Sequence, residues 1–135
     1  MLTLILTRPD LTAPLLQEGL RSRVFSEPLM LRNEDFRDDT QARIFTLLRE
    51  HAGGDLDAVL LDERARPLMD HIGALASQGE RLFPSECSVR EAWLRLAILS
   101  REHAKRETTD YDRKERLQIE SQRLKRALRS VSAEA

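Results

Sequence analysis

The sequence is poor in the residues on which several classes of protein depend. Its 135 residues include a single cysteine, Cys87, which excludes an internal disulfide framework and a metal site built from several cysteines. Aromatic residues make up only 4% of the chain, and the three histidines lack the spacing of metal ligands. A formal net charge of −1 gives no overall basic field for nucleic acid. No apolar run reaches the roughly 18 residues of a membrane span, so a soluble, cytoplasmic protein is expected.

The residues that are abundant favour solvated helices around a modest core. Charged residues make up 33% of the chain and hydrophobic residues 41%, a balance that suits long helices better than a β-sandwich. The length predicts one domain with, at most, one extended element attached. The sequence contains no nucleophile elbow, P-loop or glycine-rich dinucleotide fingerprint. A non-enzymatic protein without a cofactor is therefore the first expectation.

Short apolar runs alternate with helical patterns over the first 100 residues. The runs predict strands over residues 2–7, 24–31, 58–61 and 81–83, with Pro28 interrupting the second of them. The segments between them carry leucines and isoleucines at helical spacing. Such alternation predicts an α/β fold, a small parallel-sheet, flavodoxin-like domain over residues 1–100 with a long C-terminal helix over 101–135.

The apolar run of residues 56–61 ends in two carboxylates, Asp62 and Glu63. In an open α/β sheet the carboxyl edge of the strands is where ligands bind, so these acids, with Asp10, are candidates for an acidic edge. The alternative interpretation is that Asp62 only caps the helix that follows it.

Residues 57–62, Asp-Ala-Val-Leu-Leu-Asp, resemble the third strand and phosphoacceptor aspartate of response-regulator receiver domains. Residues 81–86, followed by 88–99, resemble their last strand, proline turn and last helix. The resemblance implies that Asp62 is the phosphoacceptor position. The chain departs from the family at Thr7-Arg8-Pro9, where receivers carry the acidic pair that holds Mg²⁺, and at Phe83, where they carry a lysine. The resemblance therefore implies a pseudo-receiver whose acidic edge is vestigial, with a phosphorylation-competent receiver as the alternative.

A second, partial resemblance joins residues 4–9 and Glu27-Pro28-Leu29 to the first half of uroporphyrinogen-III synthase. That family uses two α/β domains with the substrate between them. This chain has room for one domain, and residues 62–65, Asp-Glu-Arg-Ala, stand where the family has a hydroxyl-bearing loop. Lyase activity is not expected.

The C-terminal third predicts long helix. Ser88 and Glu91 have the spacing of a capping box, and no glycine or proline follows up to Val131. Residues 108–110, Thr-Thr-Asp, are a candidate turn within this stretch. Apolar residues then recur at heptad spacing, at Leu117, Leu124, Leu128 and Val131. This stripe predicts a homodimeric coiled coil or a protein-partner surface, and the alternative is a helix that folds back on the body of the protein.

A short basic cluster on the same helix is a candidate for phosphate contacts. It consists of Arg123, Lys125, Arg126 and Arg129. No aromatic residues accompany it to stack bases, so a solvated helix face is the simpler interpretation. The sequence therefore predicts a signalling or assembly adaptor that dimerises or docks a partner, with nucleic-acid binding as the alternative.

Overall fold

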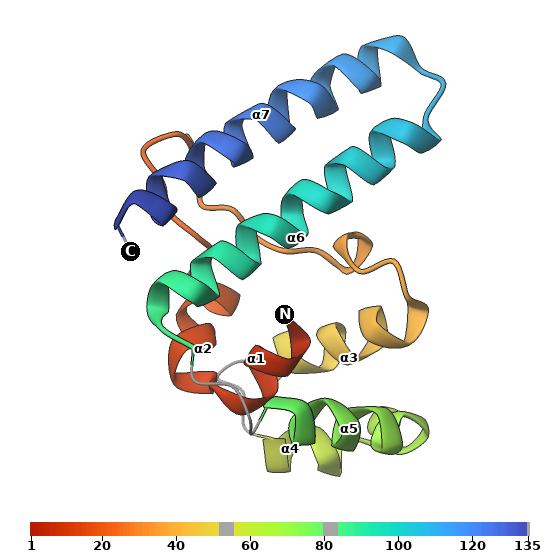
Figure 1. Cartoon of the computed structure of the whole chain (residues 1–135). Helices are drawn as coiled ribbons and strands as arrows, with labels where there is room; N and C mark the ends of the chain where they lie inside the picture. Colours follow the sequence, from red (N-terminus) through yellow and green to blue (C-terminus); the bar gives the residue numbers. More distant parts are fainter. Residues whose placement is uncertain (52–55, 80–83, 135) are drawn as a thin grey trace.

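The computed structural model of the chain describes residues 1–51, 56–79 and 84–134, and every regular element in these ranges is a helix (Figure 1). In chain order the helices, with η marking 3₁₀-helix, are α1 (Leu2–Thr7), α2 (Pro9–Glu18), η1 (Asn33–Asp35), α3 (Asp39–Glu50), α4 (Leu56–Leu61), η2 (Glu63–Leu68), α5 (Met69–Gly79), α6 (Glu86–Glu107) and α7 (Tyr111–Glu134). Within the described ranges, β-pairing is limited to one isolated bridge between Leu20 and Leu29. The predicted flavodoxin-like α/β fold is therefore wrong.

The first predicted strand, residues 2–7, is helix α1. Leu2, Ile5 and Leu6 are buried, and their spacing places them on one helical face. The hydroxyl of Thr7 donates to the carbonyl oxygen of Thr3 at 2.7 Å, a bond that ties a β-branched residue into the helix. An apolar run this short fits a strand and a buried helix equally well, and the neighbouring helices decide between them.

The predicted strand at residues 58–61 is also helical, as part of α4. Val59 is fully buried whereas Leu61 is 86% exposed, a difference that a strand buried on both faces would not show. Residues 24–31 are irregular, with a turn at Val24, a bend at Ser26 and Glu27 and the single bridge at Leu29, and form no sheet. The predicted strand at residues 81–83 lies outside the described residues.

The helices with long periodic patterns are confirmed. α3 buries Ile44, Phe45, Leu47 and Leu48, the predicted apolar face, and Asp38 caps it by accepting a hydrogen bond from the Gln41 N–H at 3.1 Å. The residues predicted as a helix after Asp62 form η2 and α5. A 3.6-residue periodicity sustained over three turns was therefore enough to predict a helix correctly.

An extended loop, residues 19–32, crosses from α2 to η1 alongside α6 and α7 (Figure 1). It starts at Gly19, whose φ of 81° and contacts with the Met30 side chain leave no room for a Cβ atom. The fully buried indole of Trp93 on α6 donates through Nε1 to the Leu29 carbonyl at 3.1 Å. This bond fixes the loop against α6.

Helices α6 and α7 form an antiparallel hairpin and lie side by side along their lengths (Figure 1). The turn between them falls at residues 108–110, as predicted. The cap of α6 is Ser85, which accepts from the Ser88 N–H at 3.1 Å, so the capping box predicted to start at Ser88 is wrong by three residues. Helix α6 runs through residue 100, where the boundary between domain and extension was predicted.

No helix in the described part of the chain is both long enough and apolar enough to span a bilayer.

Candidate functional site

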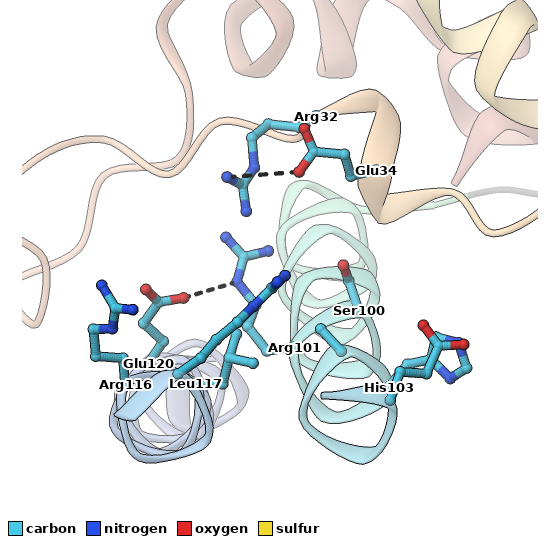
Figure 2. A pocket seen from close by; sticks show the side chains of 11 residues that line it. Arg32, Glu34, Ser100, Arg101, His103, Arg116, Leu117 and Glu120 are labelled. Carbon is cyan, nitrogen blue, oxygen red and sulfur yellow. Dashed lines mark ion pairs between the residues drawn. The ribbon is translucent and has the colours of Figure 1, made fainter. Parts of the chain in front are cut away.

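A cleft lies between η1 and the helical hairpin, and four of its eleven lining residues are arginines (Figure 2). It encloses a cavity of about 590 Å³. Its charged or ionisable lining residues are Arg32 and Glu34 from the η1 segment, Arg101, His103 and Glu107 from α6, and Arg113, Arg116 and Glu120 from α7. Three segments that are far apart in sequence thus contribute to one site.

A second cavity of about 240 Å³ extends the first along the hairpin. The two share Arg32, Arg101 and Glu120, and the second adds Arg123 from α7. Apolar lining comes from Phe25, Leu29 and Leu124. We refer to the two joined cavities as the arginine cleft.

The central residue of the arginine cleft is Arg101, whose exposure is only 8%. Its Nη1 donates to Oδ1 of Asp35 at 3.0 Å, and Asp35 is itself 2% exposed. The Ser100 hydroxyl donates to the same oxygen at 2.7 Å. Oδ2 of Asp35 accepts from the Arg32 N–H at 2.8 Å and caps η1. The buried carboxylate therefore orients Arg101 and also positions Arg32.

Arg101 retains hydrogen-bonding capacity. Its Nε is buried and makes no hydrogen bond to any described residue, although Oε2 of Glu120 lies 3.5 Å away (Figure 2). An unsatisfied buried donor on a charged group is costly.

Five arginines and four glutamates line the cleft, and only some of these arginines are paired with a carboxylate among the described residues. Glu34 lies 3.9 Å from Arg32, an exposed and weak pair, while Glu107 pairs with His103 at 2.7 Å. Arg113, Arg116 and Arg123 form no ion pair within the described part of the chain. Guanidinium groups bind carboxylates and phosphates through two parallel hydrogen bonds. The cleft is therefore suited to an anionic ligand.

The polar groups of the cleft are not arranged for nucleophilic catalysis. A serine nucleophile requires a base that accepts its proton. Instead, the Ser100 hydroxyl donates to Asp35, and His103 Nε2 pairs with Glu107. Among the described residues there is no group of three or more metal-ligating side chains.

The predicted interaction stripe on α7 faces α6 within the same chain. Leu124 is 3% exposed, Leu128 and Val131 are half-buried against the core, and Leu117 lines the arginine cleft. The helix thus folds back on its own chain, the second of the two predicted alternatives.

The four residues predicted to contact phosphate lie in different environments. Arg123 lines the cleft, whereas Nζ of Lys125 pairs with Oε1 of Glu102 on α6 at 2.6 Å and lowers the pKa of that carboxyl. Arg126 and Arg129 are exposed and line neither cavity of the cleft. The four predicted residues therefore do not form one basic surface around the cleft.

The predicted acidic residues lie outside the cleft, and two of them are paired locally. Asp10 pairs with Arg8 at 2.9 Å, and Glu63 is exposed in the first turn of η2. Asp62 caps η2 and both its oxygens are occupied: Oδ1 accepts from the Arg64 N–H at 3.0 Å, and Oδ2 accepts from Nη2 of Arg64 at 2.8 Å and contacts His51 Nε2 at 3.1 Å. Hydrogen bonds from Arg64 lower the pKa of the Asp62 carboxyl well below its ordinary value. The helix-cap interpretation of Asp62 is thus confirmed.

The sequence reading missed Arg101, Asp35 and Arg32. One signal was present, because Arg101 continues the helical spacing of the buried residues Trp93, Leu94, Ala97 and Ile98. An arginine in a core-facing register requires a buried partner, but the sequence did not indicate that this partner is Asp35, 66 residues earlier.

The fold and the cleft together define a helical protein with an arginine-lined groove beside a helical hairpin. Comparisons of the chain with protein families, with curated proteins and with solved structures find no match. The resemblance to receiver domains stays a prediction, although residues 56–61, on which it largely rests, are helical.

Proposed function

We propose that this protein is a non-enzymatic docking adaptor that binds an acidic segment of a partner protein in the arginine cleft. The proposal rests on which arginines of the cleft are paired with a carboxylate and which are not. Arg101 is held by Asp35, while Arg113, Arg116 and Arg123 on the accessible helix α7 have no carboxylate of their own among the described residues. Carboxylates of a partner would fill these positions.

The composition of the cleft favours a protein segment over nucleic acid. Glu27, Glu34 and Glu107 also line it and would repel a continuous phosphate backbone, but could pair with basic residues of a peptide. Half-buried Phe25 and Leu29 offer contacts for an apolar side chain of the same segment. Mixed charge with apolar contacts is typical of protein recognition. Docking in the cytoplasm, the location expected from the sequence, is part of the proposal.

The homodimer expected from the heptad stripe stays a prediction. Because Leu124 and its neighbours face α6, a dimer would have to use another surface. Exposed apolar residues on the hairpin include Leu99, Tyr111 and Ile119.

The test is fluorescence anisotropy with a labelled acidic peptide that contains glutamates and leucines, and with random duplex DNA as competitor. We expect saturable peptide binding that weakens at least roughly tenfold in the double variant Arg116→Gln/Arg123→Gln. The matched control is Arg126→Gln/Arg129→Gln, which removes the same charge from α7 outside the cleft and should change affinity less than about twofold.

Two results would overturn the proposal. An equal loss of peptide affinity in both double variants would indicate that the peptide is attracted nonspecifically by the net charge of the protein. Tighter binding of DNA than of peptide, with a steep salt dependence that the cleft variant reduces, would indicate nucleic-acid binding instead.

A further inference from the structure

A third cavity, separate from the arginine cleft, is lined by arginines without any carboxylate. It has a volume of about 520 Å³ and lies between the start of the extended loop, the first turns of α6 and the last turns of α7. Its cations are Arg21 and Arg23 from the loop and Arg90 from α6. None of the three forms an ion pair with a described residue. This arrangement differs from the arginine cleft, where glutamates are interspersed.

We propose that this cavity binds a small organic phosphate, with the phosphate group held by Arg21, Arg23 and Arg90. Three uncompensated guanidinium groups favour a ligand that carries more than one negative charge on a single group. A phosphate monoester carries about −1.5 to −2 at pH 7, whereas a carboxylate carries one charge. Its three terminal oxygens also match the paired donors of several arginines at once.

The floor of the cavity suits the organic part of such a ligand. Leu20, Leu94 and Ala127 line it and are at most 3% exposed, so they close the bottom of the cavity, and the half-buried Val131 adds apolar surface beside them. Ser22 and Ser130 add hydroxyl groups. The volume falls within the roughly 300–1,000 Å³ of small-molecule sites, which are apolar with a few polar groups that fix orientation.

The loop that supplies two of the arginines is fixed before any ligand binds. Leu20 and Leu29 exchange backbone hydrogen bonds of 2.9 and 2.8 Å, which close the loop between them. Within it, the Phe25 N–H donates to the Ser22 carbonyl at 3.1 Å. The bond from Trp93 to Leu29 anchors this closed loop on α6, the helix that carries Arg90. These bonds order the backbone from which the exposed Arg21 and Arg23 side chains extend, so binding an anion does not require ordering the loop itself.

The proposal is tested by titrating the whole chain with phenyl phosphate, inorganic phosphate, benzoate and phenol at fixed ionic strength. Trp93, the only tryptophan, lies next to Leu94 of the cavity floor, so its fluorescence provides a readout beside calorimetry. We expect 1:1 saturable binding of phenyl phosphate, weaker binding of inorganic phosphate, at least roughly tenfold weaker binding of benzoate, and none of phenol.

Variants then locate the site. Arg90→Gln and Arg23→Gln should each weaken the binding of phenyl phosphate at least roughly tenfold, since each removes charge-assisted hydrogen bonds. Arg95→Gln is the control, because Arg95 is exposed on the same helix and does not line the cavity. Benzoate binding as tightly as phenyl phosphate, equal losses in Arg90→Gln and Arg95→Gln, or the absence of saturation would each overturn the proposal. None of these results depends on peptide binding in the arginine cleft.

Discussion

Arg101 and Asp35 form an ion pair of 3.0 Å in which the arginine side chain is 9% exposed and the aspartate side chain fully buried. The pair joins α6 to η1 and so fixes the wall of the arginine cleft opposite α7. Buried ion pairs contribute little net stability compared with apolar residues, but removing one partner leaves the other charge buried without compensation. Its position points to a role in shaping the cleft.

Asp35→Asn should lower the free energy of unfolding by about 3–5 kcal/mol, because Arg101 would lose its buried counter-charge and keep only the exposed Glu120, 3.5 Å from its Nε. Urea unfolding, monitored through Trp93 fluorescence, measures the change. The control is Asp39→Asn, whose carboxylate pairs with Arg43 at 3.0 Å on the surface of α3. Loss of that exposed pair should cost no more than about 0.5 kcal/mol. Similar costs for the two variants would mean that Asp35 is not buried with Arg101 in solution.

The packing of α7 on α6 predicts that Leu124 stabilises the single chain. Leu124→Ala should cost about 2–5 kcal/mol, as expected for a buried leucine, whereas Leu99→Ala, at a residue 63% exposed, should cost less than about 0.5 kcal/mol. Thermal unfolding over a wide range of protein concentrations separates the hairpin from a coiled-coil dimer. If α7 packs on α6 of the same chain, the Tm should not change with protein concentration. A Tm that rises with concentration in the wild type, but not in Leu124→Ala, would indicate a coiled-coil dimer.

The error in fold class comes mainly from the ambiguity of short apolar runs. Residues 2–7 and 56–61 are six-residue runs, for which periods of 2 and 3.6 are hardly distinguishable. Strands over residues 2–7 and 58–61, alternating with helices, would form a parallel sheet, which is why the pattern predicts an α/β fold. In α3, by contrast, Ile44, Phe45, Leu47 and Leu48 extend over enough turns for the helical period to be unambiguous.

The candidate site was less predictable than the helices, because its residues meet only through tertiary packing. Arg32, Arg101 and Arg116 belong to three separate segments, and their juxtaposition depends on the hairpin turn and on the bond between Trp93 and Leu29. Heptad spacing correctly indicated that Leu124 needs an apolar partner. It did not indicate that the partner is α6 of the same chain.

The environment of Asp62 predicts an acid-dependent loss of stability. Hydrogen bonds from the Arg64 side chain, from the Arg64 backbone N–H and from His51 lower the pKa of this carboxyl in the folded state. The folded protein therefore holds the proton less tightly than the unfolded chain does. The resulting stabilisation is fully present above the ordinary value of 3.8 and is lost as the pH falls below it through the lowered pKa.

Comparing the wild type with Asp62→Asn isolates this contribution. The difference in the free energy of unfolding between them should shrink below about pH 4. The ¹³C shift of the Asp62 carboxyl, followed by NMR, should titrate below the ordinary aspartate range. A midpoint at or above the ordinary value would contradict the hydrogen bonds with Arg64.

The hairpin turn offers a prediction about how α7 begins. Oδ1 of Asp110 accepts from the N–H groups of Asp112 and Arg113 at 3.0 and 3.4 Å, so Asp110 acts as the N-cap of α7. Asp110→Ala should lower the free energy of unfolding by about 1 kcal/mol, while Asp110→Ser, which preserves a capping oxygen, should retain most of that stability. Asp112→Ala is the matched control, because it removes a carboxylate from the same turn without removing a cap and should cost less than about 0.5 kcal/mol. Equal losses in the alanine and serine variants at residue 110 would show that the charge of Asp110, rather than its cap, stabilises the turn.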